Sequence, residues 1–228
     1  MAGFAPVTAP LHCQAGLLRY ARNDVKRILP LFLALAGCSM VNPPTEIVRT
    51  PTADWHAIAT DRDRERLRSW RDAFTTALAE ARAAGHAAEI AREGALLDPD
   101  AALGGAIMPG LYRCRVIKLG SKSAGMLPYV AYPYFRCSIR QEGRLQQFAK
   151  LDGSQRPVGK IFPGDQLRQV FLGTLMLSDE GRAMQYGVDP NRDIAGFVER
   201  IGPERWRLVM PYPAFESKVD VMEIVPAA

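Results

Sequence analysis

The pattern of hydrophobic and polar positions along the chain changes its period once, near residue 110. In residues 60–81, apolar side chains recur at spacings of three and four, which is the period of a helix with one buried face. These side chains are Leu67, Trp70, Phe74, Ala77, Leu78 and Ala81. Thr60 can cap this helix at its start, and Gly85 can end it. A second, shorter helix is expected over residues 86–93, followed by a loop.

After residue 110 the period is two, which is typical of strands with one buried face. About eight strands are expected, and they cover residues 111–118, 135–141, 144–151, 158–162, 169–177, 193–201, 205–210 and 218–225. Successive antiparallel strands favour a meander that closes into a barrel, because closure removes the edge strands. The sequence therefore predicts an α+β fold, with N-terminal amphipathic helices in a segment over 60–109 packed on a small, lipocalin-like antiparallel β-barrel over 110–228.

A segment near the amino terminus has the composition of a signal peptide. In residues 25–37 a positive pair, Lys26 and Arg27, precedes a short apolar run, and small residues lead to Cys38. The apolar run is well short of the ~20 residues that a spanning helix needs, so a membrane-spanning anchor is not expected. Residues 25–37 are therefore predicted to be a signal peptide that is cut before Cys38.

This segment resembles the signal peptides of bacterial lipoproteins. The resemblance implies that the sulfur of Cys38 receives a diacylglycerol and that the new amino terminus is acylated, which together anchor a protein stably. Ser39 rather than Asp follows the cysteine, which implies delivery to the periplasmic face of the outer membrane. Residues 38–59 contain several prolines and are expected to form a lipidated tether. Residues 1–24 do not fit a signal peptide, and we expect them to be an extension outside the translated protein, which then starts at Val25.

Composition and charge indicate a globular domain. Hydrophobic residues make up 48% and charged residues 23% of the chain, which are ordinary values for globular proteins. The net charge of +5 is scattered and forms no basic block, so no nucleic-acid partner is expected. Cys114 and Cys137 lie on the apolar faces of neighbouring predicted strands, and an oxidising periplasm favours a disulfide between them. Their spacing does not suit a metal site.

Candidate chemistry is sparse in the β region. All three histidines precede it, which excludes a Ser-His-Asp or Cys-His site within the barrel. No catalytic residue, metal or cofactor is predicted, and the chain is not expected to be an enzyme. Polar side chains gather at one predicted hairpin tip, a place where binding groups often lie, and Lys150, Gln155 and Arg156 are the candidate ligand-binding residues. A glycine-containing turn with solvated side chains is the favoured explanation of the same segment, and ligand binding is the alternative.

Several short motifs carry a family resemblance. They are Asp54-Trp55, Trp70-Arg71-Asp72-Ala73, Glu93-Gly94-Ala95-Leu96-Leu97, Tyr112-Arg113-Cys114-Arg115, Phe135-Arg136-Cys137 and Gly153-Ser154-Gln155-Arg156-Pro157. They resemble a family of bacterial lipoproteins classified as domain of unknown function 4893, and the similarity covers nearly all of the chain after the signal peptide. The resemblance implies a location in the cell envelope. It implies no catalytic residues, because the family has no known activity.

Two classes of function remain open. The first, which the sequence favours, is a non-enzymatic envelope lipoprotein whose barrel binds a small amphiphilic ligand or an envelope protein partner. An eight-stranded barrel is just wide enough to be filled by side chains or to hold one small ligand, and the sequence does not decide between these states. The alternative is a protease inhibitor, because a small disulfide-bearing barrel is similar to periplasmic inhibitors of secreted metalloproteases. The long predicted helix, where such inhibitors present a short mobile segment, makes this alternative the weaker one.

Overall fold

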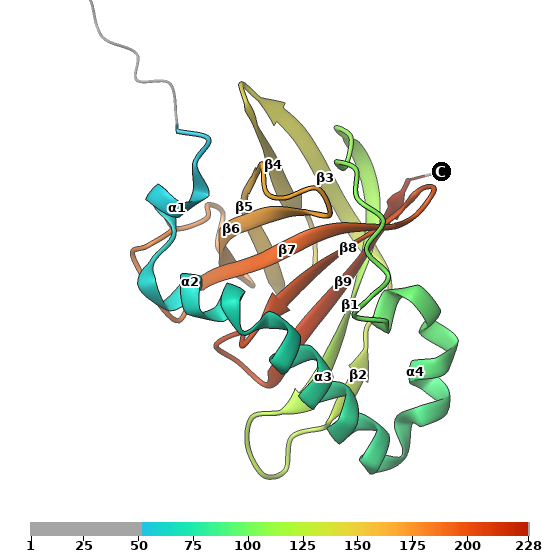
Figure 1. The fold of residues 1–228 in the computed structure, drawn as a ribbon. Coiled ribbons are helices and arrows are strands. Elements are labelled where there is room, and N and C mark those ends of the chain that lie inside the picture. The colour runs from blue at the N-terminus through green and yellow to red at the C-terminus, as the bar shows by residue number, and fades with distance from the viewer. Residues whose placement is uncertain (1–51, 228) are drawn as a thin grey trace, which may run out of the picture. The chain divides into compact units, whose positions relative to one another are not determined.

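In a computed structural model the described residues are 52–227, and they lie in one compact unit with helices first and strands after them (Figure 1). The helices are α1 (Trp55–Ile58), α2 (Asp61–Arg68), α3 (Trp70–Ala81), the π-helical turn η1 (Arg82–His86), α4 (Ala87–Glu93) and the 3₁₀ helix η2 (Gly94–Leu97). The strands are β1 (Gly110–Ser121), β2 (Tyr129–Ala131), β3 (Phe135–Glu142), β4 (Leu145–Lys150), β5 (Gln155–Phe162), β6 (Arg168–Leu177), β7 (Asp193–Gly202), β8 (Arg205–Pro211) and β9 (Ser217–Pro226). The predicted extension, signal peptide and lipidation site at Cys38 lie outside the described residues.

Eight strands close into an antiparallel barrel, which confirms the predicted fold. The order is β1-β3-β4-β5-β6-β7-β8-β9, and β9 pairs back onto β1 from Tyr112↔Pro226 to Ser121↔Ser217. Each barrel strand pairs with the next one along the chain, so the topology is a meander. The short strand β2 was not predicted, and it pairs with the last part of β1, beyond the five residues of β1 that pair with β3. β1 is therefore long enough to serve three neighbours.

The N-terminal helices pack on the outside of this barrel, as predicted. α3 contacts β1, β8 and β9, and α2 contacts β7. Phe74 and Leu78 of α3 are buried in one apolar cluster with the strand residues Ile117, Val209 and Val221, whose side chains point away from the barrel interior. The three-and-four spacing of the α3 sequence thus reflects burial of one helix face against the barrel wall.

The predicted helix ends are partly correct. Thr60 caps α2 through its Oγ1, which accepts the backbone N–H of Asp63 at 3.2 Å. Gly85 has φ of 98°, a conformation that favours glycine, and interrupts the helix where the sequence indicated an end. The sequence predicted one continuous helix up to Gly85, but Ser69 leaves the helical conformation and separates α2 from α3.

Helix α1 lies within residues 38–59, which the sequence assigned to the tether. Asp54 caps this short helix, because its side chain accepts the N–H of His56 at 3.0 Å. The helical segment therefore begins at Trp55, earlier than the predicted residue 60.

One end of the barrel is filled by apolar side chains. Ile107, from the segment before β1, is fully buried and belongs to the interior cluster. Its backbone N–H donates to Oε1 of Gln169 at 3.1 Å, and its carbonyl accepts from Nε2 of Gln146 at 2.7 Å. These two glutamines therefore pair the backbone N–H and carbonyl of Ile107 inside the barrel.

Cys114 of β1 and Cys137 of β3 form the predicted disulfide inside the barrel. Their Cα atoms lie 6.0 Å apart, and both side chains are buried. Inward-facing Val116 follows Cys114 on the same face of β1, and inward-facing Phe135 precedes Cys137 on β3. The disulfide therefore ties the two strands together directly beside the other end of the barrel.

Candidate functional site

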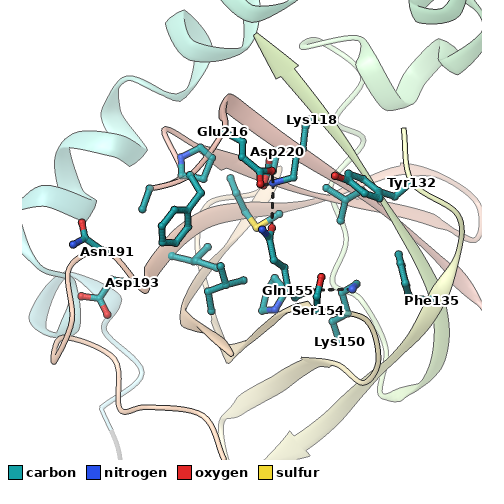
Figure 2. A pocket seen from close by; sticks show the side chains of 18 residues that line it. Lys118, Tyr132, Phe135, Lys150, Ser154, Gln155, Asn191, Asp193, Glu216 and Asp220 are labelled. Atoms are coloured by element: carbon teal, nitrogen blue, oxygen red, sulfur yellow. Dashed lines mark hydrogen bonds and ion pairs between the residues drawn. The ribbon is translucent and has the colours of Figure 1, made fainter. Parts of the chain in front are cut away.

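A cavity of about 220 Å³ occupies the end of the barrel opposite Ile107. Figure 2 shows the side chains that line it. Its apolar lining is Val116, Phe135, Pro157, Leu175, Ile194, Met210, Pro213, Ala214 and Phe215. Its polar and charged lining includes Lys118, Lys150, Ser154, Gln155, Asn191, Asp193, Glu216 and Asp220. Figure 2 shows these polar groups arriving from several strands and loops around one hollow.

Strand alternation explains why this end is polar. On β1 the inward positions continue from Cys114 through Val116 to Lys118, and on β4 they continue from Phe148 to Lys150. The inward face of each strand therefore changes from apolar to charged over one step of two residues. The result is a ring of polar groups above an apolar floor that is continuous with the barrel core.

Lys118 is neutralised within the ring. It stands opposite Asp220 in the β1–β9 register, and its Nζ lies 3.3 Å from Oδ2 of Asp220 and 3.0 Å from Oε2 of Glu216. Burial acts to lower the pKa of Lys118, but the two carboxylates outweigh it and raise that pKa. Burial raises the pKa of Asp220, against the opposing effect of Lys118. Lys118 also donates to the side-chain oxygen of Gln155 at 3.2 Å.

Lys150 has a different environment. Its side chain is buried, and Nζ donates to the backbone carbonyls of Asp152 at 2.8 Å and Gln155 at 2.9 Å. Nζ also lies 3.7 Å from the centre of the Phe135 ring, a cation–π contact. Burial lowers the pKa of Lys150 to about 8, and the charges of Arg156 and Lys118 act in the same direction, against Asp152.

Within residues 52–227, no carboxylate lies within ion-pair distance of Lys150. Asp152, next to it in sequence, pairs instead with Arg136, whose backbone N–H and Nε reach the carboxylate at 3.0 and 2.9 Å. Gln155 links the two lysines, because its side chain accepts from Lys118 and its backbone carbonyl accepts from Lys150. Among the described residues, the ammonium of Lys118 is thus paired with carboxylates, whereas the ammonium of Lys150 contacts two backbone carbonyls and the Phe135 ring.

The three predicted ligand-binding residues separate into two groups. Lys150 and Gln155 line the cavity, whereas Arg156 faces the other side of β5 and is not part of the lining. The Arg156 guanidinium donates to the carbonyls of Gly153, Ser178 and Glu180 at 3.0, 2.7 and 2.8 Å. It fixes the hairpin tip to the loop after β6. Ligand binding by these residues stays a prediction.

Sequence reasoning missed Lys118 and Asp220. Lys118 is the last residue of the predicted strand over 111–118 and was not among the candidate residues, although it continues the inward series of Cys114 and Val116. Asp220 likewise continues the inward series of Met222 and Ile224 on β9 in the other direction. Both residues could have been found in the sequence, because each is a charged residue at an inward-facing position of a predicted strand.

In residues 52–227, no group of three or more His, Cys, Asp and Glu side chains is arranged to hold a metal ion. No helix in this range is long and apolar enough to cross a membrane. The cavity combines an apolar floor with two ammonium groups, three carboxylates and several neutral hydrogen-bonding side chains. This lining suits a small molecule with a polar and an apolar part.

Comparisons with known proteins identify a family. No curated protein matches the chain, and no solved structure matches it. The family model described as Domain of unknown function (DUF4893) matches residues 55–224. The match runs from α1 into the last barrel strand and so includes the helices, the disulfide and the cavity. The chain therefore belongs to the DUF4893 family.

Proposed function

We propose that this protein is a non-enzymatic lipoprotein of the bacterial cell envelope, held by a lipid anchor on Cys38 at the periplasmic face of the outer membrane, and that its barrel binds a small amphiphile. The anchor part of the proposal is supported by the signal-peptide pattern of residues 25–37 and by the small residues before Cys38. A disulfide between Cys114 and Cys137 suits an oxidising compartment.

The observation that carries the binding proposal is the asymmetry of the barrel interior. Ile107 and its glutamine contacts fill one end, whereas the other end contains a cavity of about 220 Å³. Small-molecule sites are typically concave, with mostly apolar walls and a few convergent polar groups, and this end of the barrel has that form. The apolar floor with a polar ring above it matches a molecule that has both kinds of surface.

Native mass spectrometry of residues 39–228, produced with the disulfide formed, tests ligand binding. We expect an excess mass that is present in the native protein and is lost on denaturation. A native mass equal to the disulfide-bonded chain, together with no change in thermal stability when amphiphiles are added, would contradict the proposal and direct attention to an envelope protein partner.

Cell fractionation tests the anchor. The full chain is expected in the outer-membrane fraction and to incorporate labelled fatty acid. A Cys38→Ser variant is expected to lose the label, because the serine hydroxyl does not replace the cysteine sulfur as the lipid acceptor. Incorporation of label by the serine variant would contradict lipidation at this position, and Ser39→Ala, which leaves Cys38 in place, is the control that should keep the label.

A further inference from the structure

Lys150 has the geometry of an anion-binding group. Its ammonium carries three N–H donors, and two of them donate to the carbonyls of Asp152 and Gln155. The side chain is only 4% exposed, yet it lines the cavity. A buried positive charge normally has a negative partner, because burial without one is costly. Within residues 52–227, the carboxylate nearest in sequence, Asp152, already pairs with Arg136.

The second lysine of the cavity makes the contrast clear. Lys118 is within 3.3 Å of two carboxylates, Asp220 and Glu216. An anionic ligand would compete with both carboxylates there, whereas at Lys150 it meets an ammonium that has no ion-pair partner among the described residues. Of the three carboxylates that line the cavity, Glu216 and Asp220 pair with Lys118, and Asp193 accepts the backbone N–H of Gly187 at 2.9 Å. Among the described residues, an anionic ligand group is therefore favoured at Lys150.

The apolar floor determines the polarity and size of the rest of the ligand. Val116, Leu175, Ile194 and Met210 line the cavity and adjoin the barrel core. A cavity of about 150 Å³ is known to hold benzene, so a cavity of about 220 Å³ has room for about nine non-hydrogen atoms. A second hollow shares Phe215 with the first, so a somewhat longer chain can extend over the mouth.

We infer that the ligand is a small monoanionic amphiphile, such as a medium-chain carboxylate, whose anionic group contacts Nζ of Lys150 and whose apolar part lies against the cavity floor. The inference rests on the proposed binding function and adds the charge of the ligand, its size and the residue that recognises it. The carboxylate accepts the remaining N–H of Lys150, and a charge-assisted hydrogen bond in a buried site is stronger than a neutral one.

The test is calorimetric titration of residues 39–228, which contain the whole compact unit, with three eight-carbon probes that carry an anionic, a neutral and a cationic head group. These probes are octanoate, octanamide and octylamine, measured at pH 7. Octanoate is expected to bind at least about tenfold more tightly than octanamide, because the amide matches its shape but lacks its charge. Lys150→Met is expected to remove this difference. Lys150→Arg is expected to keep a preference for octanoate.

Lys160→Met is the matched control. Lys160 lies on the outward face of β5 and pairs with Glu142, so its loss changes the net charge equally without touching the cavity. Thermal melting of each variant verifies folding, and the comparison of probes on the unmodified chain does not depend on any variant. Equal binding of octanoate and octanamide, or tightest binding of octylamine, would overturn the inference and leave the binding function standing. If none of the probes binds and the native protein carries no excess mass, both fail.

Discussion

Replacing Arg207 with methionine is expected to destabilise the protein by about 3–5 kcal/mol. The side chain lies on the outward face of β8 under the helices and is fully buried. Nε donates to Oε2 of Glu199 at 2.6 Å. Nη1 donates to the three carbonyls at the end of η2, those of Ala95, Leu96 and Asp98, at 3.0, 2.9 and 2.7 Å. Arg207 thus joins the helical segment to the barrel wall.

The magnitude follows from what the substitution leaves behind. Removing one partner of a buried ion pair costs about 3–5 kcal/mol, because the other charge stays buried. Carbonyls that lose a buried donor cost about 1–3 kcal/mol each, unless the segment shifts to find water. Nε of Arg168 lies 2.6 Å from Oε1 of Glu199, so Arg168 still partly neutralises the Glu199 carboxylate in the variant and limits the loss of stability. The expected change is a large part of the ~5–15 kcal/mol by which domains are stable.

Urea unfolding followed by tryptophan fluorescence measures the change. In a variant that combines Arg207→Met with Glu199→Gln, the loss is expected to be smaller than the sum of the two single losses by about 0.5–3 kcal/mol, because the unpaired charge is gone. Arg68→Met is the control, since Arg68 and Glu65 form an ion pair with side chains 70% and 63% exposed, and no measurable change is expected. A loss below about 1 kcal/mol for Arg207→Met, or strict additivity in the double variant, would refute the reasoning.

Three further predictions concern the barrel interior. Replacing Cys114 and Cys137 with serine is expected to lower the free energy of unfolding by about 3–4 kcal/mol for a bridge between residues 23 apart, measured against the oxidised chain in urea; equal urea midpoints would contradict this. Lys118→Met is expected to cost more stability at pH 7 than at pH 4. Burial raises the pKa of Asp220 in the folded protein, and the loss of Lys118 raises this pKa further, so the folded variant loses stability as pH rises and Asp220 must ionise without a partner. Equal losses of stability at the two pH values would contradict this prediction. Since the pKa of Lys150 is lowered from 10.5 to about 8, the unfolded chain binds more protons between these values, so stability is expected to rise with pH across that window and Lys150→Met to flatten the rise.

Most of the fold could be predicted because the buried faces are regular. The three-and-four spacing of α3 and the two-residue period of the barrel strands both report one apolar face, and the predicted barrel strands match the observed ones within a few residues. Strand β2 could not be found in this way, because three residues with intermediate or exposed side chains give no period. The break at Ser69 was also hidden, since the apolar spacing continues from Leu67 to Trp70 across it.

The candidate site was harder to predict, because it depends on contacts between distant residues. The sequence indicated the hairpin tip that carries Lys150 and Gln155, but it could not show that Arg156, one position later, points out of the barrel toward Ser178 and Glu180. It also ended the predicted strand at Lys118, whereas pairing with β9 continues β1 to Ser121. The side of a strand on which a charge lies can be read only when the strand ends are known.

Strand alternation nevertheless gives a rule that the sequence alone could apply. In a small closed barrel, every second side chain of each strand enters the interior, and a charged residue at such a position needs compensation or a ligand. Lys118 and Asp220 satisfy each other across β1 and β9, so their presence is explained by the fold. Lys150 stands at the equivalent end of β4, and its neighbour in register, Cys137, offers no charge. By the same physical argument that accounts for Lys118, the partner of Lys150 is to be sought in a molecule that the barrel binds.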